Sequence, residues 1–169
     1  MTIDSFKYLP RIISYYYKTT AIKSTKEIPW QTIKKPLSEC RFGLVTSGGL
    51  FDRTIDPPFD VEREKVEPTW GDPTYRKISN DIKQQNMGVS HLHINPVDII
   101  SDFNILLPIH RFVELENENI IGSLSRFSYS FMGYQGFPPN TASWEERYAT
   151  EVAEAFIKDG VDCVLLTPS

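Results

Sequence analysis

The segment 143–166 predicts a helix followed directly by an apolar strand, and this pair restricts the possible folds more than any other feature. Ser143 and Glu146 have the spacing of a helix capping box, and Gly160 stands where a left-handed residue ends a helix. Residues 161–166 (VDCVLL) form a nearly continuous apolar run, typical of a parallel strand buried on both faces. The pair therefore predicts an α/β fold with a mostly parallel sheet flanked by helices.

Earlier segments supply further elements of the same sheet. Residues 41–45 (RFGLV) predict a strand that leads into a small Gly-rich turn of residues 46–49. Further strands are expected over 87–94 and 126–132, and a helix over 109–117. Residues 51–80 are rich in Pro, Asp and charge without a sustained period, so a long ordered loop is expected there.

The 169 residues are the usual size of a single domain. The spacing of apolar residues after Pro10 predicts a short amphipathic helix within residues 5–18, and residues 1–38 are expected to be a helix and an extended arm. Residues 39–169 are then the core. A parallel strand buried on both faces rarely ends a sheet without a further element to cover it, so we expect the domain to be truncated at its C-terminus.

Composition argues against several classes of protein. The net charge of -4 disfavours a nucleic-acid or anionic-membrane partner, because both reward a basic surface. No run of 18 apolar residues predicts a membrane span, and the residues after Met1 lack a signal-peptide pattern. Two cysteines far apart do not form a disulfide framework. A cytoplasmic protein is expected, with Cys163 buried and inert in its strand and Cys40 without an activating neighbour.

Polar residues follow three of the predicted strands, and ligands of open α/β sheets bind beyond the carboxyl ends of strands. The residues in question are Thr46, Ser47, Gly48 and Gly49 after the first strand, His91 and His93 in the second, and Thr167 and Ser169 after the last. The Gly-rich turn either presents N–H groups to a carboxylate or phosphate, or uses glycine only for its backbone conformation.

His91 and His93 are two residues apart, so on a strand their side chains share one face. A shared metal, a general acid–base pair and a structural pair all remain open. Because no third ligand stands at a recognised spacing, no metal site is predicted, and no cofactor is predicted either. Arg76, in the segment 71–76 (GDPTYR), is suited to bind a substrate carboxylate.

Taken together, these motifs resemble the glycine/sarcosine/betaine reductase selenoprotein B family, which also includes the D-proline reductase subunit. The resemblance covers nearly the whole chain from residue 28, and its order and spacing fit best in the closing segments. The segments that carry it include 44–49 (LVTSGG), 58–60 (PFD), 71–76 (GDPTYR), 90–93 (SHLH), 107–111 (LPIHR), 129–134 (YSFMGY) and 159–168 (DGVDCVLLTP).

The resemblance implies an oxidoreductase subunit that reductively cleaves a C–N bond in a small amino acid or betaine-like substrate, together with a thiol or selenol redox partner protein. It places the nucleophile, a selenocysteine or cysteine, just beyond Ser169. Either an in-frame UGA at that codon is read as a stop, which we favour, or the protein ends there and is catalytically empty. His91 or His93 is then the hypothetical proton donor, with Thr46, Ser47, Gly48, Gly49, Arg76 and Thr167 around the substrate.

Two alternatives belong to other functional classes. A non-catalytic α/β module would keep this fold to bind a small carboxylate or to assemble with a partner. A metal-dependent hydrolase using His91 and His93 ranks lowest, because a third metal ligand is not evident.

Overall fold

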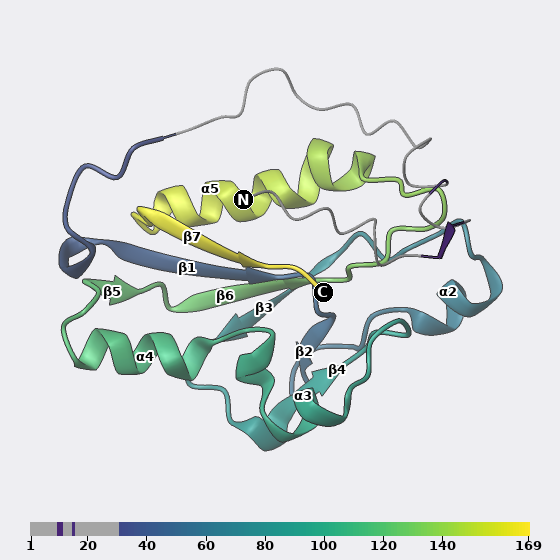
Figure 1. Ribbon diagram of the computed structural model, residues 1–169, viewed down its shortest axis with the longest axis horizontal. Coiled ribbons are helices and arrows are strands. Elements are labelled where there is room, and N and C mark those ends of the chain that lie inside the picture. The colour runs from purple at the N-terminus through teal and green to yellow at the C-terminus, as the bar shows by residue number, and fades with distance from the viewer. Residues whose placement is uncertain (1–9, 12–14, 16–30) are drawn as a thin grey trace. The chain divides into compact units, whose positions relative to one another are not determined.

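The computed structural model describes residues 10, 11, 15 and 31–169 (Figure 1). The chain divides into a unit Met1–Thr32 and a unit Ile33–Ser169. In the first unit, Arg11 and Tyr15 have helical backbone. Most of the helix predicted within residues 5–18, and most of the extended arm, lie outside the described residues.

The second unit alternates strands and helices along the chain. Its strands are β1 (Arg41–Thr46), β2 (Leu50–Asp52), β3 (Tyr75–Ser79), β4 (Met87–Val89), β5 (Ser123–Leu124), β6 (Phe127–Phe131) and β7 (Cys163–Thr167). Its α-helices are α2 (Val61–Val66), α3 (Val97–Ser101), α4 (Ile109–Asn117) and α5 (Ala149–Lys158). Short 3-10 turns lie at η2 (Leu37–Glu39), η3 (Gln84–Asn86) and η4 (Phe103–Ile105), and a π-helical turn, η5 (Trp144–Tyr148), leads into α5.

Strand β1 lies at the centre of a five-stranded sheet. It pairs in parallel with β7 from Phe42 to Thr46, and in parallel with β5 and β6. Because β7 occupies one edge of β1 along this whole length, β5 and β6 share the other edge. Strand β3 joins β6 in antiparallel orientation, and β2 and β4 form a separate antiparallel pair. The predicted mostly parallel sheet flanked by helices is confirmed.

The two faces of this sheet carry different layers. Helix α5 covers one face, and α3 and α4 lie on the other (Figure 1). Side chains of successive residues in β1 point to opposite faces of the sheet, as in any strand. Leu44 belongs to the cluster with α3 and α4, and Val45 packs against the cluster with α5. Helix α5 contributes Val152 and Phe156, four residues apart and so on one face of the helix.

Strand β7 is parallel as predicted, but the expected burial on both faces is wrong. Val164, Leu165 and Leu166 are 44%, 37% and 68% exposed. An apolar run does not distinguish an interior strand from the outermost strand of a sheet, and β7 is the outermost strand among the described residues. For the same reason Cys163 is only half-buried rather than fully buried.

The predicted capping box is also wrong. Ser143 already has helical backbone, with φ -65° and ψ -29°, and its side chain caps nothing. The helical backbone begins earlier, at Ala142, whose N–H donates to Asn140 Oδ1 at 3.1 Å. At the other end the prediction is confirmed, because Gly160 has a φ of +72°.

Two further segments differ from expectation. The loop predicted over 51–80 contains α2 and β3. Helix α2 has only six residues, too few to show a helical period, and Asp60 begins it by accepting the N–H of Arg63 at 3.0 Å. The strand predicted over 87–94 ends at Val89, so His91 and His93 lie in a turn rather than on one strand face.

Candidate functional site

The carboxyl ends of β1 and β7 are joined by hydrogen bonds at one edge of the sheet. The Thr167 carbonyl accepts the Ser47 N–H at 3.2 Å and the Thr46 hydroxyl at 3.0 Å. One residue beyond Pro168, the Ser169 N–H donates to Ser47 Oγ at 3.0 Å. Thr167 Oγ1 donates to the Val45 carbonyl at 3.2 Å, and also to the carbonyl of Leu106. The residues after β7 are therefore fixed against the residues after β1.

The Gly-rich turn after β1 uses its N–H groups within the chain. Gly48 N–H donates to Thr46 Oγ1 at 3.1 Å, and Gly49 N–H donates to the Phe131 carbonyl at 2.8 Å. Gly49 has a φ of +64°, and a Cβ there would lie 2.4 Å from the Ser90 carbonyl oxygen. Glycine is needed for this backbone conformation and close approach, which favours the structural interpretation of the turn over an anion-binding one.

Gly133, just after β6, is the point where the separate segments meet. A Cβ built on Gly133 would lie 3.0 Å from the Ser169 carbonyl oxygen, 3.0 Å from the Ser47 carbonyl oxygen and 3.1 Å from His91 Nε2. Three groups that are far apart in the sequence thus surround one position without a side chain. We call Ser47, Ser169, His91 and Gly133 the polar corner.

The tautomer of His91 follows from its local hydrogen bond. The His93 N–H donates to His91 Nδ1 at 3.2 Å, so the proton of the neutral ring is on Nε2. This Nε2 is buried and has no hydrogen-bond partner among the residues that the structure describes. Burial, and to a lesser extent the nearby His93, lowers the pKa of His91 below its ordinary value of 6.5. The polar corner therefore contains a neutral imidazole with an unsatisfied N–H donor.

His93 is held by a buried carboxylate. Its Nε2 lies 2.9 Å from Glu64 Oε1 of α2, and its ring lies over Tyr134 with centroids 4.5 Å apart. The Glu64 side chain is 2% exposed, whereas that of His93 is 52% exposed. Burial raises the pKa of Glu64, opposed by the hydrogen bond with His93. The pair thus links an exposed imidazole to an interior carboxylate.

Glu64 was not expected from the sequence. It lies in the charged hexapeptide VEREKV of residues 61–66, where nothing marks one carboxylate as buried. Gly133 and Tyr134 belong to the segment 129–134 that carried the family resemblance, but no local feature of the sequence predicted their contacts with the histidines. These contacts arise from the folding of α2 and β6 against the turn at residues 90–93.

Arg76 is committed to contacts within the chain. Its guanidinium donates to the carbonyls of Pro57 at 2.9 Å and Pro58 at 3.2 Å, and to Thr74 Oγ1 at 2.8 Å. It also lies over the ring of Phe59, 4.1 Å from the centroid. These contacts fix the loop before α2, and a substrate carboxylate would have to compete with them.

The cysteines show no sign of activation. Cys40 is fully buried, and its Sγ donates to the Pro36 carbonyl at 3.3 Å. Burial, and then a hydrogen bond with Cys40, raises the pKa of the Cys163 thiol, so less of it is thiolate at neutral pH. The Cys163 thiol therefore lacks the depressed pKa expected of a nucleophile.

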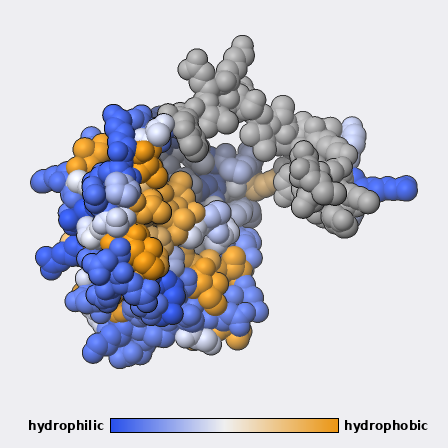
Figure 2. Space-filling view, turned by 60° about the vertical axis from the view of Figure 1, so that its left-hand side comes forward, coloured by the Kyte–Doolittle hydropathy of each residue, from blue (hydrophilic) through white to orange (hydrophobic). Residues whose placement is uncertain are grey.

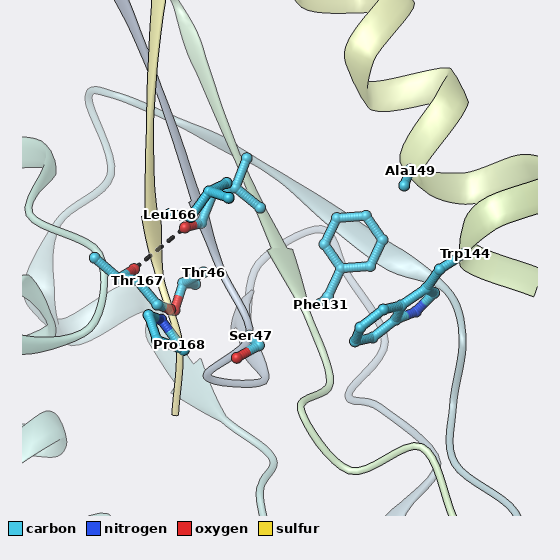
Figure 3. Close-up of a pocket in the computed structure, with 9 residues that line it drawn as sticks. Thr46, Ser47, Phe131, Trp144, Ala149, Leu166, Thr167 and Pro168 are labelled. Atoms are coloured by element: carbon cyan, nitrogen blue, oxygen red, sulfur yellow. Dashed lines mark hydrogen bonds between the residues drawn. The ribbon is translucent and has the colours of Figure 1, made fainter. Parts of the chain in front are cut away.

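An apolar pocket of about 550 Å³ adjoins the polar corner. Figure 3 shows Leu166 and Pro168 on one side of it, Phe131 and Trp144 on the other, and Ser47 between them. The rings of Phe131 and Trp144 meet edge to face, with centroids 5.4 Å apart. This pocket suits a small group with apolar surface whose polar end reaches Ser47.

Two further properties concern only residues 10, 11, 15 and 31–169. In this part of the chain, no group of three or more His, Cys, Asp or Glu side chains is placed to hold a metal ion. Every helix described there is too short or too polar to cross a lipid bilayer.

The chain is similar to subunits of two reductases. It is 30% identical over 138 residues to the D-proline reductase subunit gamma of Acetoanaerobium sticklandii, an alignment that covers 82% of this chain and 52% of that protein. It is 29% identical over 144 residues to the glycine reductase complex component B subunit gamma of Symbiobacterium thermophilum, with coverages of 85% and 32%. The counterpart in Peptoclostridium acidaminophilum is 26% identical over 133 residues, with coverages of 79% and 28%.

The chain thus spans about half the length of the first relative and about a third of the other two. No solved structure matches it. The family model described as glycine/sarcosine/betaine reductase selenoprotein B matches residues 9–169, nearly the whole chain. The chain therefore belongs to the glycine/sarcosine/betaine reductase selenoprotein B family.

Proposed function

We propose that this chain forms the substrate site of an oxidoreductase subunit that reductively cleaves a C–N bond in a small amino acid or betaine-like amine. The nucleophile is a selenol or thiol at the position directly after Ser169. One observation carries the proposal: Ser169, Ser47 and His91 converge on Gly133, beside an apolar pocket. A residue that follows Ser169 starts from this corner, and the names of the relatives support reductase chemistry.

The reaction divides between the nucleophile and a dithiol partner. The selenolate or thiolate attacks the substrate carbon, the C–N bond breaks, and the amine leaves with the electron pair and takes up a proton. One thiol of the partner protein then attacks the selenium or sulfur, which forms a mixed bond, and the carbon fragment leaves with the electron pair and takes up a proton. The second thiol of the partner breaks this mixed bond, so the selenolate or thiolate is released and the dithiol becomes a disulfide. The two electrons of the reduction come from that dithiol.

The two histidines have different roles in this scheme. His91 is neutral and donates Nε2–H, so it stabilises an anion in the corner, either the nucleophile or the substrate carboxylate. His93 has Glu64 as a hydrogen-bond partner at 2.9 Å, and its side chain is half exposed, so a substrate amine can reach it. His93 is therefore the proton donor to the leaving amine, and Glu64 positions it.

The pocket limits the substrate to a small molecule with apolar surface. Phe131 and Trp144 offer aromatic faces to a ring or to methyl groups on nitrogen, and a cationic nitrogen gains further from aromatic faces. Thr46, Ser47 and Thr167 line the same pocket, and the hydroxyls of Thr46 and Thr167 are already bonded to backbone carbonyls. A cytoplasmic location is part of the proposal, because a free thiol or selenol needs reducing surroundings.

Amine release tests the proposal. The gene is read through the codon after Ser169, with selenocysteine or cysteine at that position, and the protein is incubated with a dithiol and with D-proline, glycine, sarcosine or betaine in turn. We expect one C–N cleavage per disulfide formed with at least one of these substrates, and none after the nucleophile is replaced by serine. Binding of a substrate without cleavage would contradict the enzyme and favour a non-catalytic module.

A further inference from the structure

The outer edge of β7 offers unpaired backbone groups. All five residues of β7 pair with β1, and β7 has no second strand partner among residues 31–169. The Thr167 carbonyl faces β1, since it accepts the Ser47 N–H. Backbone groups alternate in direction along a strand, so those of Leu166 and Val164 face outward. A strand edge of this kind is a template for one more strand.

The side chains of β7 are those of an interior strand. Val164 and Leu166 lie on the face of α5, where they line a second apolar pocket, and Leu165 lies on the opposite face. All three are more than a third exposed. Parallel strands are normally covered on both faces, and their apolar composition reflects that cover. Strand β7 has this composition, and the described part of the chain does not supply the cover.

The second pocket, of about 340 Å³, continues the first one along the groove between α5 and β7. Ala153 and Ile157 of α5 form one wall, and Val164 and Leu166 of β7 form the other. Ile157 is exposed and apolar as well. In Figure 2, which turns the left-hand side of Figure 1 forward, hydrophobic residues form a band between hydrophilic regions.

The handedness of the existing crossover selects the face on which a further helix would lie. From β6 the chain runs through α5 to β7, across β1, and both strands are parallel to β1. Such crossovers are right-handed in nearly all proteins. A right-handed crossover that continues in the same direction from β7 places its helix on the same face as α5. That is the face with the apolar groove.

We propose that the outer edge of β7 and the groove beside α5 bind one further helix-and-strand unit, provided by polypeptide that follows Ser169. Its strand pairs with β7 in parallel, and its helix packs on Ile157, Val164 and Leu166. The relatives are longer proteins, since the chain spans only 52% of one and 32% of another. The helix also closes the open side of the pocket next to Ser47, so the same unit completes the substrate site.

Hydrogen exchange tests this inference without any assay of activity. Amide exchange of residues 161–168 is measured by mass spectrometry in the 169-residue chain and in the chain read through the codon after Ser169, each over a range of protein concentrations. We expect exchange at Val164 and Leu166 to be at least about 10-fold slower in the longer chain, at every concentration. Equal exchange in both chains would overturn the inference, as would the lack of an open reading frame after that codon.

Two substitutions in the longer chain sharpen the test. Leu166→Pro removes an outward N–H and leaves the inward groups of Leu165 and Thr167 in place, so protection at Val164 should fall back toward that of the 169-residue chain. Leu166→Lys should also lower protection at Val164, because it places a charge in the apolar groove where the helix would pack. Ile55→Lys is the matched control at a similarly exposed apolar residue away from β7, and it should change nothing. If protection appears in the 169-residue chain only at high concentration, with dimers in sedimentation, a second copy occupies the edge and the inference is wrong.

Discussion

The two faces of the five-stranded sheet differ in how completely they are covered. On the face of α3 and α4, a cluster with Leu44, Ile78, Phe103, Leu107 and Ile109 is almost fully removed from solvent. On the face of α5, a smaller, mostly aromatic cluster is bordered by an apolar groove that stays open along β7. The face of α3 and α4 thus holds most of the buried core, and the face of α5 holds the pocket beside the edge strand β7. The buried core and the proposed substrate pocket therefore lie on opposite faces of the sheet.

The largest difference between the faces should appear in core truncations. Phe103 is fully buried, so Phe103→Ala should lower the free energy of unfolding by about 3–5 kcal/mol. Leu166→Ala, at an exposed site on the other face, should lower it by less than about 1 kcal/mol. Urea unfolding followed by circular dichroism measures both. If both variants lose the same free energy of unfolding, the two faces do not differ in their contribution to stability.

The histidines give the next largest contrast. In the longer, active chain, His93→Gln should lower kcat by about 100-fold or more, the usual contribution of a general acid, with little change in the free energy of unfolding. His110→Gln is the matched control, because His110 lies against Phe103 and bonds Asn104 and the Ile82 carbonyl. It should cost about 1 kcal/mol of stability and leave kcat unchanged. The reverse pattern would exclude His93 as proton donor.

A smaller effect tests how easily side chains on the α5 face can shift. A Cβ on Gly43 would lie 2.6 Å from the ring of Phe156, which borders the open groove. Since the ring has space to move, Gly43→Ala should cost only about 1 kcal/mol. On Gly71 the nearest atom is the backbone oxygen of Tyr134 at 2.2 Å, which cannot move as easily, so Gly71→Ala should cost more. Chemical denaturation measures the free energy of unfolding of both variants. A larger decrease for Gly43→Ala than for Gly71→Ala would mean that α5 is rigidly packed.

The smallest expected effect is a pH dependence of stability from His91. Its pKa is lowered in the folded chain by burial, so below its ordinary value of 6.5 the unfolded chain binds a proton that the folded chain does not. The free energy of unfolding should therefore fall as the pH drops below about 6.5, and His91 should contribute nothing above that value. The His91→Asn variant should show a weaker fall in urea titrations between pH 5 and 8. If the free energy of unfolding changes with pH equally in the variant and in the unchanged chain, His91 is not buried as described.

Much of the parallel sheet could be predicted from sequence, because β1, α5 and β7 have clear local patterns. The predictions that were wrong concerned features that depend on contacts between residues distant in the chain. The residues of β7 are equally apolar in an interior strand and at an edge, so only pairing partners distinguish the two. Glu64 has a charged local context, and its burial depends on the tertiary fold, which brings it against His93, 29 residues away. The proximity of Ser169 to Ser47 was expected, since parallel strands end at the same edge of a sheet.

Ligand titration by NMR shows whether Ser47, Ser169, His91 and Gly133 form one substrate site. D-proline, glycine, sarcosine and betaine are titrated into the 15N-labelled chain, with Gly133→Ala as the variant that fills the corner. We expect the amides of Ser47, Gly133 and Ser169 to shift together, with one dissociation constant, for at least one of these ligands. Binding should weaken at least about 10-fold in the variant. Shifts confined to other regions, or none at millimolar ligand, would contradict a single substrate site.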